Sequence, residues 1–225
     1  MKGSTESILA AGVSRRKFLS YAGLAGAGMF IASCRDDEKK DPEPDNTINL
    51  GSGDTGILNY LYAMEQLQAA FYIQVSSSFY SGVSALEKSL LKDISEHEIA
   101  HREFFRNILG DANVIPDLEF DFSNVTFTSR ESVLGTASVL KELSVAAYNG
   151  VAQYLNTTDY MATASKIASV EARHAAVLLE LMTVNSFADY TNGDGMDAWK
   201  TPEEVLATVD RHFKTKLSVK NLPKS

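Results

Sequence analysis

The chain of 225 residues is long enough for one domain with a sizeable core or for two small domains. Hydrophobic residues make up 44% of it and prolines number only five, which is ordinary for a globular protein. The single cysteine excludes an intramolecular disulfide and a thiolate metal site. The formal net charge of −8 argues against a nucleic-acid-binding protein, because no basic patch offsets it.

The N-terminal segment has the features of an export signal. Residues 14–19 (SRRKFL) resemble the twin-arginine export motif, and an apolar run of 16 residues, 18–33, overlaps and follows them. This run is shorter than the roughly 20 residues of a membrane-spanning helix, and residues 31–34 (IASC) resemble a lipoprotein signal box. We therefore predict that residues 1–33 are a twin-arginine signal peptide and that Cys34 carries a lipid. The alternative is a transmembrane anchor with a chance arginine pair.

The rest of the chain divides by composition. Residues 34–50 are charged, contain proline and hold few apolar residues, so we predict a flexible acidic tether. Residues 51–217 carry the helical pattern of a folded domain, and residues 218–225 are predicted to be a tail. A lipid at Cys34 would hold the exported domain on a membrane, in the periplasm or on the outer membrane or cell surface.

Apolar periodicity predicts an all-α domain. It indicates four long helices and one short C-terminal helix, over residues 55–78, 83–109, 130–155, 159–187 and 201–214. Residues 111–129 lack this period and contain Pro116, so they are predicted to be an extended crossover between the second and third helices. A crossover of this length lets those two helices run parallel in a four-helix bundle. Trp199 is predicted to pack the short helix against the bundle.

Two Glu-x-x-His pairs interrupt apolar stripes of the predicted helices. Glu98 and His101 lie on the inner stripe of the second helix, and Glu171 and His174 lie on that of the fourth. Residues three apart share one helix face, so each pair points a carboxylate and an imidazole at the same place. Charged groups on a buried stripe are unfavourable unless they are paired or bind a metal. The pairs therefore predict a metal site in the core.

A single glutamate precedes each pair on the helix before it. Glu65 lies on the first helix and Glu142 on the third, on a predicted inner stripe with Val139, Ala146, Asn149 and Gln153. The two sets of three residues recur with offsets of 77, 73 and 73 residues, which predicts two similar hairpins around a pseudo-twofold axis. Four carboxylates and two imidazoles suit two iron or manganese ions, with positions left open for water, oxygen or peroxide.

Several polar residues lie beside the proposed ligands on the helical wheel. Metal ligands need hydrogen-bond partners, and the candidates for this role are Gln68, Tyr72, Tyr148 and Asn149. Residues of these types are more often simply part of a core, and Gln68, one turn after Glu65, is the leading candidate. His97 and His212 have no glutamate three residues before them, so they are predicted to be surface or helix-end residues.

Several segments resemble the ferritin-like superfamily, and most of all the bacterial ferritin-like domain that is related to plant desiccation-related proteins. They are residues 61–65 (LYAME), 96–101 (EHEIAH), 142–150 (ELSVAAYNG), 170–176 (VEARHAA) and 201–205 (TPEEV). The resemblance implies a ferritin-like four-helix bundle with a dinuclear metal site, and all six expected ligand positions are filled. The superfamily includes ferroxidases, manganese catalases, oxygenases and proteins of unknown activity.

From this resemblance we expect a protein that uses two iron or manganese ions, as an oxidoreductase acting on peroxide or dioxygen in the manner of a ferroxidase or manganese catalase. The alternative is a non-catalytic metal-binding or desiccation-protective protein with a structural dimetal site. The expected partners are a small oxidant and, through Cys34, a membrane, while a homo-oligomer is left open. A sealed iron-storage cage is disfavoured, because a lipid anchor and tether fit such a shell poorly.

Overall fold

The computed structural model describes residues 47–189 and 193–224 of the chain. The predicted signal peptide, Cys34 and most of the predicted tether lie outside these residues. Among the described helices, none combines the length and the apolar character needed to cross a lipid bilayer.

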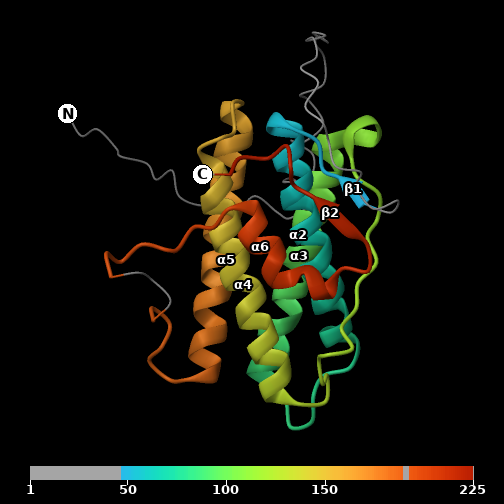
Figure 1. Ribbon diagram of the computed structural model, residues 1–225. Coiled ribbons are helices and arrows are strands. Elements are labelled where there is room, and N and C mark those ends of the chain that lie inside the picture. Colours follow the sequence, from blue (N-terminus) through green and yellow to red (C-terminus); the bar gives the residue numbers. More distant parts are fainter. Residues whose placement is uncertain (1–46, 190–192, 225) are drawn as a thin grey trace, which may run out of the picture. The chain divides into compact units, whose positions relative to one another are not determined.

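Four long helices form a bundle and confirm the predicted all-α fold (Figure 1). They are α2 (Gly53–Ser77), α3 (Ala85–Asn113), α4 (Arg130–Ala152) and α5 (Thr158–Met182), and α6 (Pro202–Val209) is the short C-terminal helix. Helix α2 packs mainly on α3, and α4 mainly on α5. Figure 1 shows α3 and α4 running in the same direction, which the long crossover between them makes possible.

The crossover, residues 114–129, is held on the bundle by two amide side chains of α2. Asn59 accepts a hydrogen bond from the Ile115 N–H at 3.1 Å, and Gln66 accepts one from the Leu118 N–H at 2.8 Å. Buried backbone groups of an irregular segment need such partners, because no helix or sheet satisfies them. The two amides therefore explain how a segment without regular structure stays ordered along a helix.

A small outer layer covers the bundle beside the crossover. Strand β1 (Thr47–Asn49) pairs in parallel with β2 (Lys216–Ser218), and the side chains of Leu50 and Leu222 next to the strands are buried. The last residues of the predicted tether and most of the predicted tail therefore belong to the folded domain. Between this layer and the bundle, α2 is buried on nearly all sides from Gly56 to Ala69.

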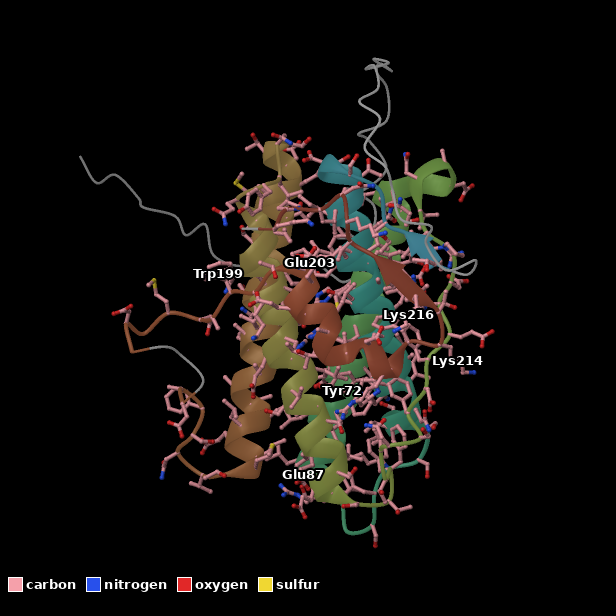
Figure 2. All side chains as sticks on the ribbon, in the orientation of Figure 1. Tyr72, Glu87, Trp199, Glu203, Lys214 and Lys216 are labelled. Carbon is pink, nitrogen blue, oxygen red and sulfur yellow. The ribbon has the colours of Figure 1, made fainter. Side chains whose placement is uncertain are left out.

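The segment that leads into α6 is held directly on α4. The Lys200 N–H donates to an α4 carbonyl at 3.0 Å, and the Asn149 amide donates to the Ala198 carbonyl at 3.1 Å. The backbone approaches so closely at Gly150 that a Cβ there would lie 1.9 Å from the Lys200 oxygen. Trp199, labelled in Figure 2, is 59% exposed, so the prediction that it packs α6 against the bundle is wrong.

Glu87, at the lower end of the bundle in Figure 2, ties three helices together. Its carboxylate accepts a hydrogen bond from the Ser84 N–H at 2.9 Å, which closes a capping box at the start of α3. It also accepts one from Arg130 at 2.6 Å, and this guanidinium donates to the Leu181 carbonyl near the end of α5 at 2.6 Å. Burial alone would raise the pKa of Glu87, but the hydrogen bonds from Ser84 and Arg130 lower it below its usual value.

We predict that Glu87→Gln lowers stability at neutral pH by about 1 kcal/mol, because the charged cap and its ion pair are lost. A lowered native pKa means that the unfolded state binds more protons, so this contribution is present above the unfolded pKa and disappears as the pH falls through the native value. Urea unfolding between pH 3 and 7 should show a shallower acid limb for Glu87→Gln. Asp111→Asn, an exposed carboxylate of the same helix, should keep the wild-type limb.

We predict that Gly150→Ala destabilises the domain by about 1–3 kcal/mol, because the new methyl group must displace the Lys200 backbone. Gly135→Ala is the matched control on the same helix, since a Cβ there meets no atom within 4 Å. This control should be neutral or stabilising by up to about 1 kcal/mol. Thermal unfolding of both variants measures the difference, and equal stability would contradict the close approach.

Candidate metal centre

Five of the six predicted ligands meet in the core of the bundle. Helix α2 contributes Glu65, α3 contributes Glu98 and His101, and α5 contributes Glu171 and His174. The three carboxylate residues are fully buried, and the two histidines are 6% and 7% exposed. The three-residue spacing brings each pair to the inner face of its helix, as the sequence predicts.

The ligand atoms of these residues converge on one small volume. One atom from each of Glu65, Glu98, His101 and Glu171 lies within 4.8 Å of the others. The His101 Nδ1 atom lies 3.2 Å from a Glu171 oxygen and 3.6 Å from a Glu65 oxygen. The His174 Nδ1 atom lies 3.3 Å from a Glu98 oxygen.

Several of these buried atoms make no hydrogen bond of good geometry within the described chain. They are Glu65 Oε2, both carboxylate oxygens of Glu98, Glu171 Oε1 and the Nδ1 atoms of both histidines. Buried polar atoms in proteins are almost always satisfied. A cluster of unsatisfied carboxylate and imidazole atoms pointing at one another is therefore the arrangement expected of a cation site.

Glu142 does not join the cluster, and the structure corrects its predicted placement. Its side chain is only partly buried and accepts a hydrogen bond from Ser138 at 2.9 Å. The neighbouring Lys141 points inward instead and is fully buried. Its Nζ atom lies 2.5 Å from a Glu98 oxygen and 2.7 Å from a Glu171 oxygen.

The misplacement comes from the register of α4. Two residues of the predicted inner stripe, Asn149 and Gln153, are exposed, and Val139 is 43% exposed. The buried stripe runs one or two positions earlier, through Leu134, Ala137, Lys141, Ser144, Tyr148 and Val151. Sequence reasoning therefore missed Lys141, although its seven-residue spacing to Tyr148 repeats that of Glu65 to Tyr72.

Two of the four predicted neighbours of the ligands, Tyr148 and Tyr72, contact the cluster, and Gln68 is buried one turn after Glu65. The Tyr148 hydroxyl donates to Glu65 at 2.5 Å, and the Lys141 ammonium lies 5.4 Å from the centre of the Tyr72 ring, which Figure 2 labels in the bundle. The Gln68 amide donates to the Ser144 hydroxyl at 3.1 Å. The fourth, Asn149, is exposed and binds the segment before α6 instead.

His97 is a second residue that sequence reasoning missed, because it was predicted to be a surface residue. Its Nδ1 atom lies 2.9 Å from His174 Nε2, and the two rings are stacked with centres 5.1 Å apart. His212, also predicted at the surface, is 2% exposed, and its Nδ1 atom lies 3.1 Å from the Asp121 carbonyl. Contacts of this kind join different elements, so spacing within one helix does not reveal them.

The comparison with protein families decides the classification of this bundle. Residues 53–183, more than half of the chain, match the model of the ferritin-like domain. The chain belongs to the ferritin-like domain family. The match spans all four long helices, and so includes every residue of the buried cluster. A comparison with curated proteins finds no match for the chain.

The electrostatics of the ferritin-like core are dominated by Lys141. Burial would raise the pKa of Glu171, but the Lys141 ammonium and His101 lower it well below its usual range. Burial and the nearby Glu171 carboxylate raise the pKa of Glu98 to about 8. Burial would lower the pKa of His101, but the nearby carboxylates of Glu171 and Glu65 raise it to about 10. The ammonium and a proton on His101 therefore offset carboxylate charge in the cluster when it holds no metal.

The donor set fits a metal ion on the side of Glu65 and His101. There the unsatisfied atoms of Glu65, His101 and Glu171 face one another, and mixed carboxylate and imidazole ligands suit iron or manganese. On the other side His174 lies beside Glu98, which is paired with the Lys141 ammonium, and α4 supplies no fourth carboxylate there. The cluster can thus hold a metal ion, and its two sides are chemically different.

We predict that Lys141→Met lowers the free energy of unfolding by about 3–5 kcal/mol, because it leaves two buried carboxylates without their cation. The adjacent Glu142→Gln is the control and should change stability by less than about 0.5 kcal/mol. Urea unfolding of the metal-free chain at pH 7 measures both. Similar losses from the two substitutions would contradict the placement of Lys141 in the core.

Proposed function

We propose that the chain is a metal-dependent oxidoreductase of the ferritin-like type, which uses iron or manganese and acts on peroxide or dioxygen. The observation that carries this proposal is the set of buried, unsatisfied carboxylate and imidazole atoms that converge between α2, α3 and α5. These ligands tolerate more than one oxidation state of iron or manganese. A bound ion of this kind would supply one-electron chemistry toward a small oxidant.

The protein groups around the cluster support this role by fixing the ligands. Glu65 is held by the Tyr148 hydroxyl, which binds one of its oxygens and leaves the other facing His101. Lys141 holds one oxygen each of Glu98 and Glu171. Ligands oriented in this way need little rearrangement when a metal binds.

The contact between His97 and His174 fixes a proton. Burial and the nearby Lys141 lower the pKa of His174 to about 2, so its ring is neutral. If Nδ1 of His174 faces a metal as an acceptor, its proton is on Nε2, which then donates to His97 Nδ1 at 2.9 Å. His97 therefore acts as a positioning residue for the imidazole behind it.

The surroundings favour a small substrate. The cluster is enclosed by the helices, and a cavity of about 400 Å³ between α4 and α5 has Tyr148 among its lining residues. The ring of Tyr148 is buried, and its hydroxyl touches Glu65. Peroxide and dioxygen are small enough to pass a side chain that moves slightly, whereas a larger substrate would have to open the bundle.

A second candidate function is a non-catalytic metal-binding or desiccation-protective protein. The ion pairs of Lys141 favour it, because they give the cluster a structural role that needs no turnover. The resemblance of the sequence to the desiccation-related branch points the same way. Here a metal would raise stability without accelerating any reaction.

We also propose that the protein is exported by the twin-arginine route and anchored by a lipid at Cys34, on the periplasmic or outer face of a membrane. The sequence motif around the arginine pair and the box before Cys34 support this proposal. Membrane fractionation tests it, because Cys34→Ala should release the protein into the soluble fraction. Retention of this variant on the membrane would contradict the lipid anchor.

Metal loading tests the proposed activity. The purified full chain, loaded without oxygen with Fe²⁺ or Mn²⁺, should retain the metal on desalting and then consume peroxide or dioxygen faster than the free ion. His101→Gln should lose metal and at least tenfold in turnover, because it removes an unsatisfied donor. Glu142→Gln, which lies outside the cluster, should match the wild type.

Each outcome of this assay separates the candidates. Retained metal with a higher melting temperature but no turnover above the free ion would replace the oxidoreductase by the non-catalytic protein. Failure of the wild-type chain to retain either ion would contradict both candidates.

A further inference from the structure

We propose that the ammonium of Lys141 stands in place of a second metal ion, so that the cluster binds one ion, on the side of Glu65 and His101. This inference rests on the proposed metal-dependent function and deepens it, because it fixes the number of ions and their side of the cluster. Four observations carry it.

The internal repeat makes Lys141 the counterpart of Glu65. Glu65 and Tyr72 on α2 are seven residues apart, and so are Lys141 and Tyr148 on α4, with an offset of 76 residues for both. Each tyrosine contacts the counterpart residue of the other helix: Tyr148 donates to Glu65, and the Lys141 ammonium lies over the Tyr72 ring. A cation therefore occupies the position where the symmetry of the bundle would put another carboxylate.

The contacts of the ammonium are those that a second metal ion would need. A second ion would share the carboxylates of Glu98 and Glu171 with the first. The Lys141 Nζ atom already lies 2.5 and 2.7 Å from the Oε2 atoms of these two residues. The ammonium donates a hydrogen bond to Glu171 Oε2 and forms an ion pair with Glu98 Oε2, so it competes with an ion for both oxygens.

On the side of Glu65 and His101, the donor atoms lie about as far apart as the ligands of a single ion. Ligands that bind one ion at about 2.1 Å lie roughly 3.0–3.4 Å from one another in octahedral or tetrahedral geometry. The His101 Nδ1 atom lies 3.2 Å from Glu171 Oε1, within this range, and 3.6 Å from Glu65 Oε2, slightly above it. All three atoms are unsatisfied within the described chain, and none of them contacts Lys141. The His174 side also has unsatisfied atoms, Glu98 Oε1 and His174 Nδ1 at 3.3 Å, but there α4 brings an ammonium in place of a further carboxylate.

The charge of the buried groups also matches one ion. Three ionised carboxylates and one ammonium have a net charge of −2 when the imidazoles are neutral, and one divalent ion brings the cluster to zero. Two divalent ions would leave a net charge of +2 in a fully enclosed core, which is strongly unfavourable. The substitution of lysine for a carboxylate thus changes the capacity of the site by one ion.

Stoichiometry tests the inference without any activity measurement. The purified full chain is incubated with Mn²⁺ alone, freed of unbound ion, and assayed for metal per chain by mass spectrometry and for spin coupling by electron paramagnetic resonance. We expect one ion per chain with the spectrum of an isolated Mn²⁺. Two ions per chain with a coupled spectrum would overturn the inference and leave the proposed metal-binding function standing.

Three variants sharpen the result. Lys141→Glu should raise the stoichiometry to two ions per chain and produce a coupled spectrum, because it restores the missing carboxylate and removes the ammonium. Glu65→Gln should lose the bound ion, while a full equivalent retained by this variant would overturn the assignment to the Glu65 side. Glu142→Gln, the neighbour of Lys141 on the outer face, should keep one ion.

The remaining outcomes are also decisive. If neither the wild type nor a folded Lys141→Glu chain binds Mn²⁺ or Fe²⁺, the proposed function fails and the inference fails with it. If only Lys141→Glu binds metal, the inference and the proposed metal-dependent function both fail, because the ammonium then excludes every ion from the wild-type chain. Should circular dichroism show that Lys141→Glu does not fold, the wild-type stoichiometry and Glu65→Gln still decide the question.

Discussion

The ion pairs of Lys141 with Glu98 and Glu171 are the interaction on which the rest of the core depends. Each of these three groups is fully buried, and an isolated charge in such a place would be strongly destabilising. Together they leave each carboxylate with one neutralised oxygen and one oxygen that is free to bind a metal. Tyr148 does the same for Glu65 by binding only one of its oxygens. The protein thus stabilises its charged core and keeps donor atoms available with the same contacts.

The outer layer of the fold protects this core from water. The crossover, the two short strands and the segment before α6 lie on helices that already carry the cluster on their inner faces. Helix α2 consequently needs apolar or hydrogen-bonded residues on almost every face, which is why Asn59 and Gln66 appear there beside its apolar residues. Exclusion of water strengthens every electrostatic interaction inside the bundle. The ion pairs and the covering layer therefore act together.

The sequence predicted the features that periodicity alone determines. The four helices, the parallel arrangement across the crossover and the Glu-x-x-His pairs follow from spacing along single helices. The register of α4 does not follow from spacing, because this helix is apolar over a wide arc. The glutamate that the motif led us to expect, Glu142, is the residue after Lys141. Two further contacts join distant parts of the chain: His97 with His174, and β1 with β2. No local sequence pattern predicts them. The correct α4 register was nevertheless encoded in the repeated seven-residue spacing to Tyr72 and Tyr148.

The repeat also explains why one substitution changes the whole site. The two hairpins place residues 65 and 141 at equivalent positions beside the carboxylates of Glu98 and Glu171. A residue at either position can therefore supply a metal ligand or a positive charge. With glutamate at both, the empty core would hold four repelling carboxylates, and its stability would depend on bound metal. With lysine at one, the ammonium attracts the carboxylates that would otherwise repel each other, and the bundle can close before metal arrives. The same lysine makes the two sides of the site unequal, because His101 lies beside Glu65, whereas His174 lies beside its partner His97 and beside Glu98, one of the two carboxylates that the ammonium holds.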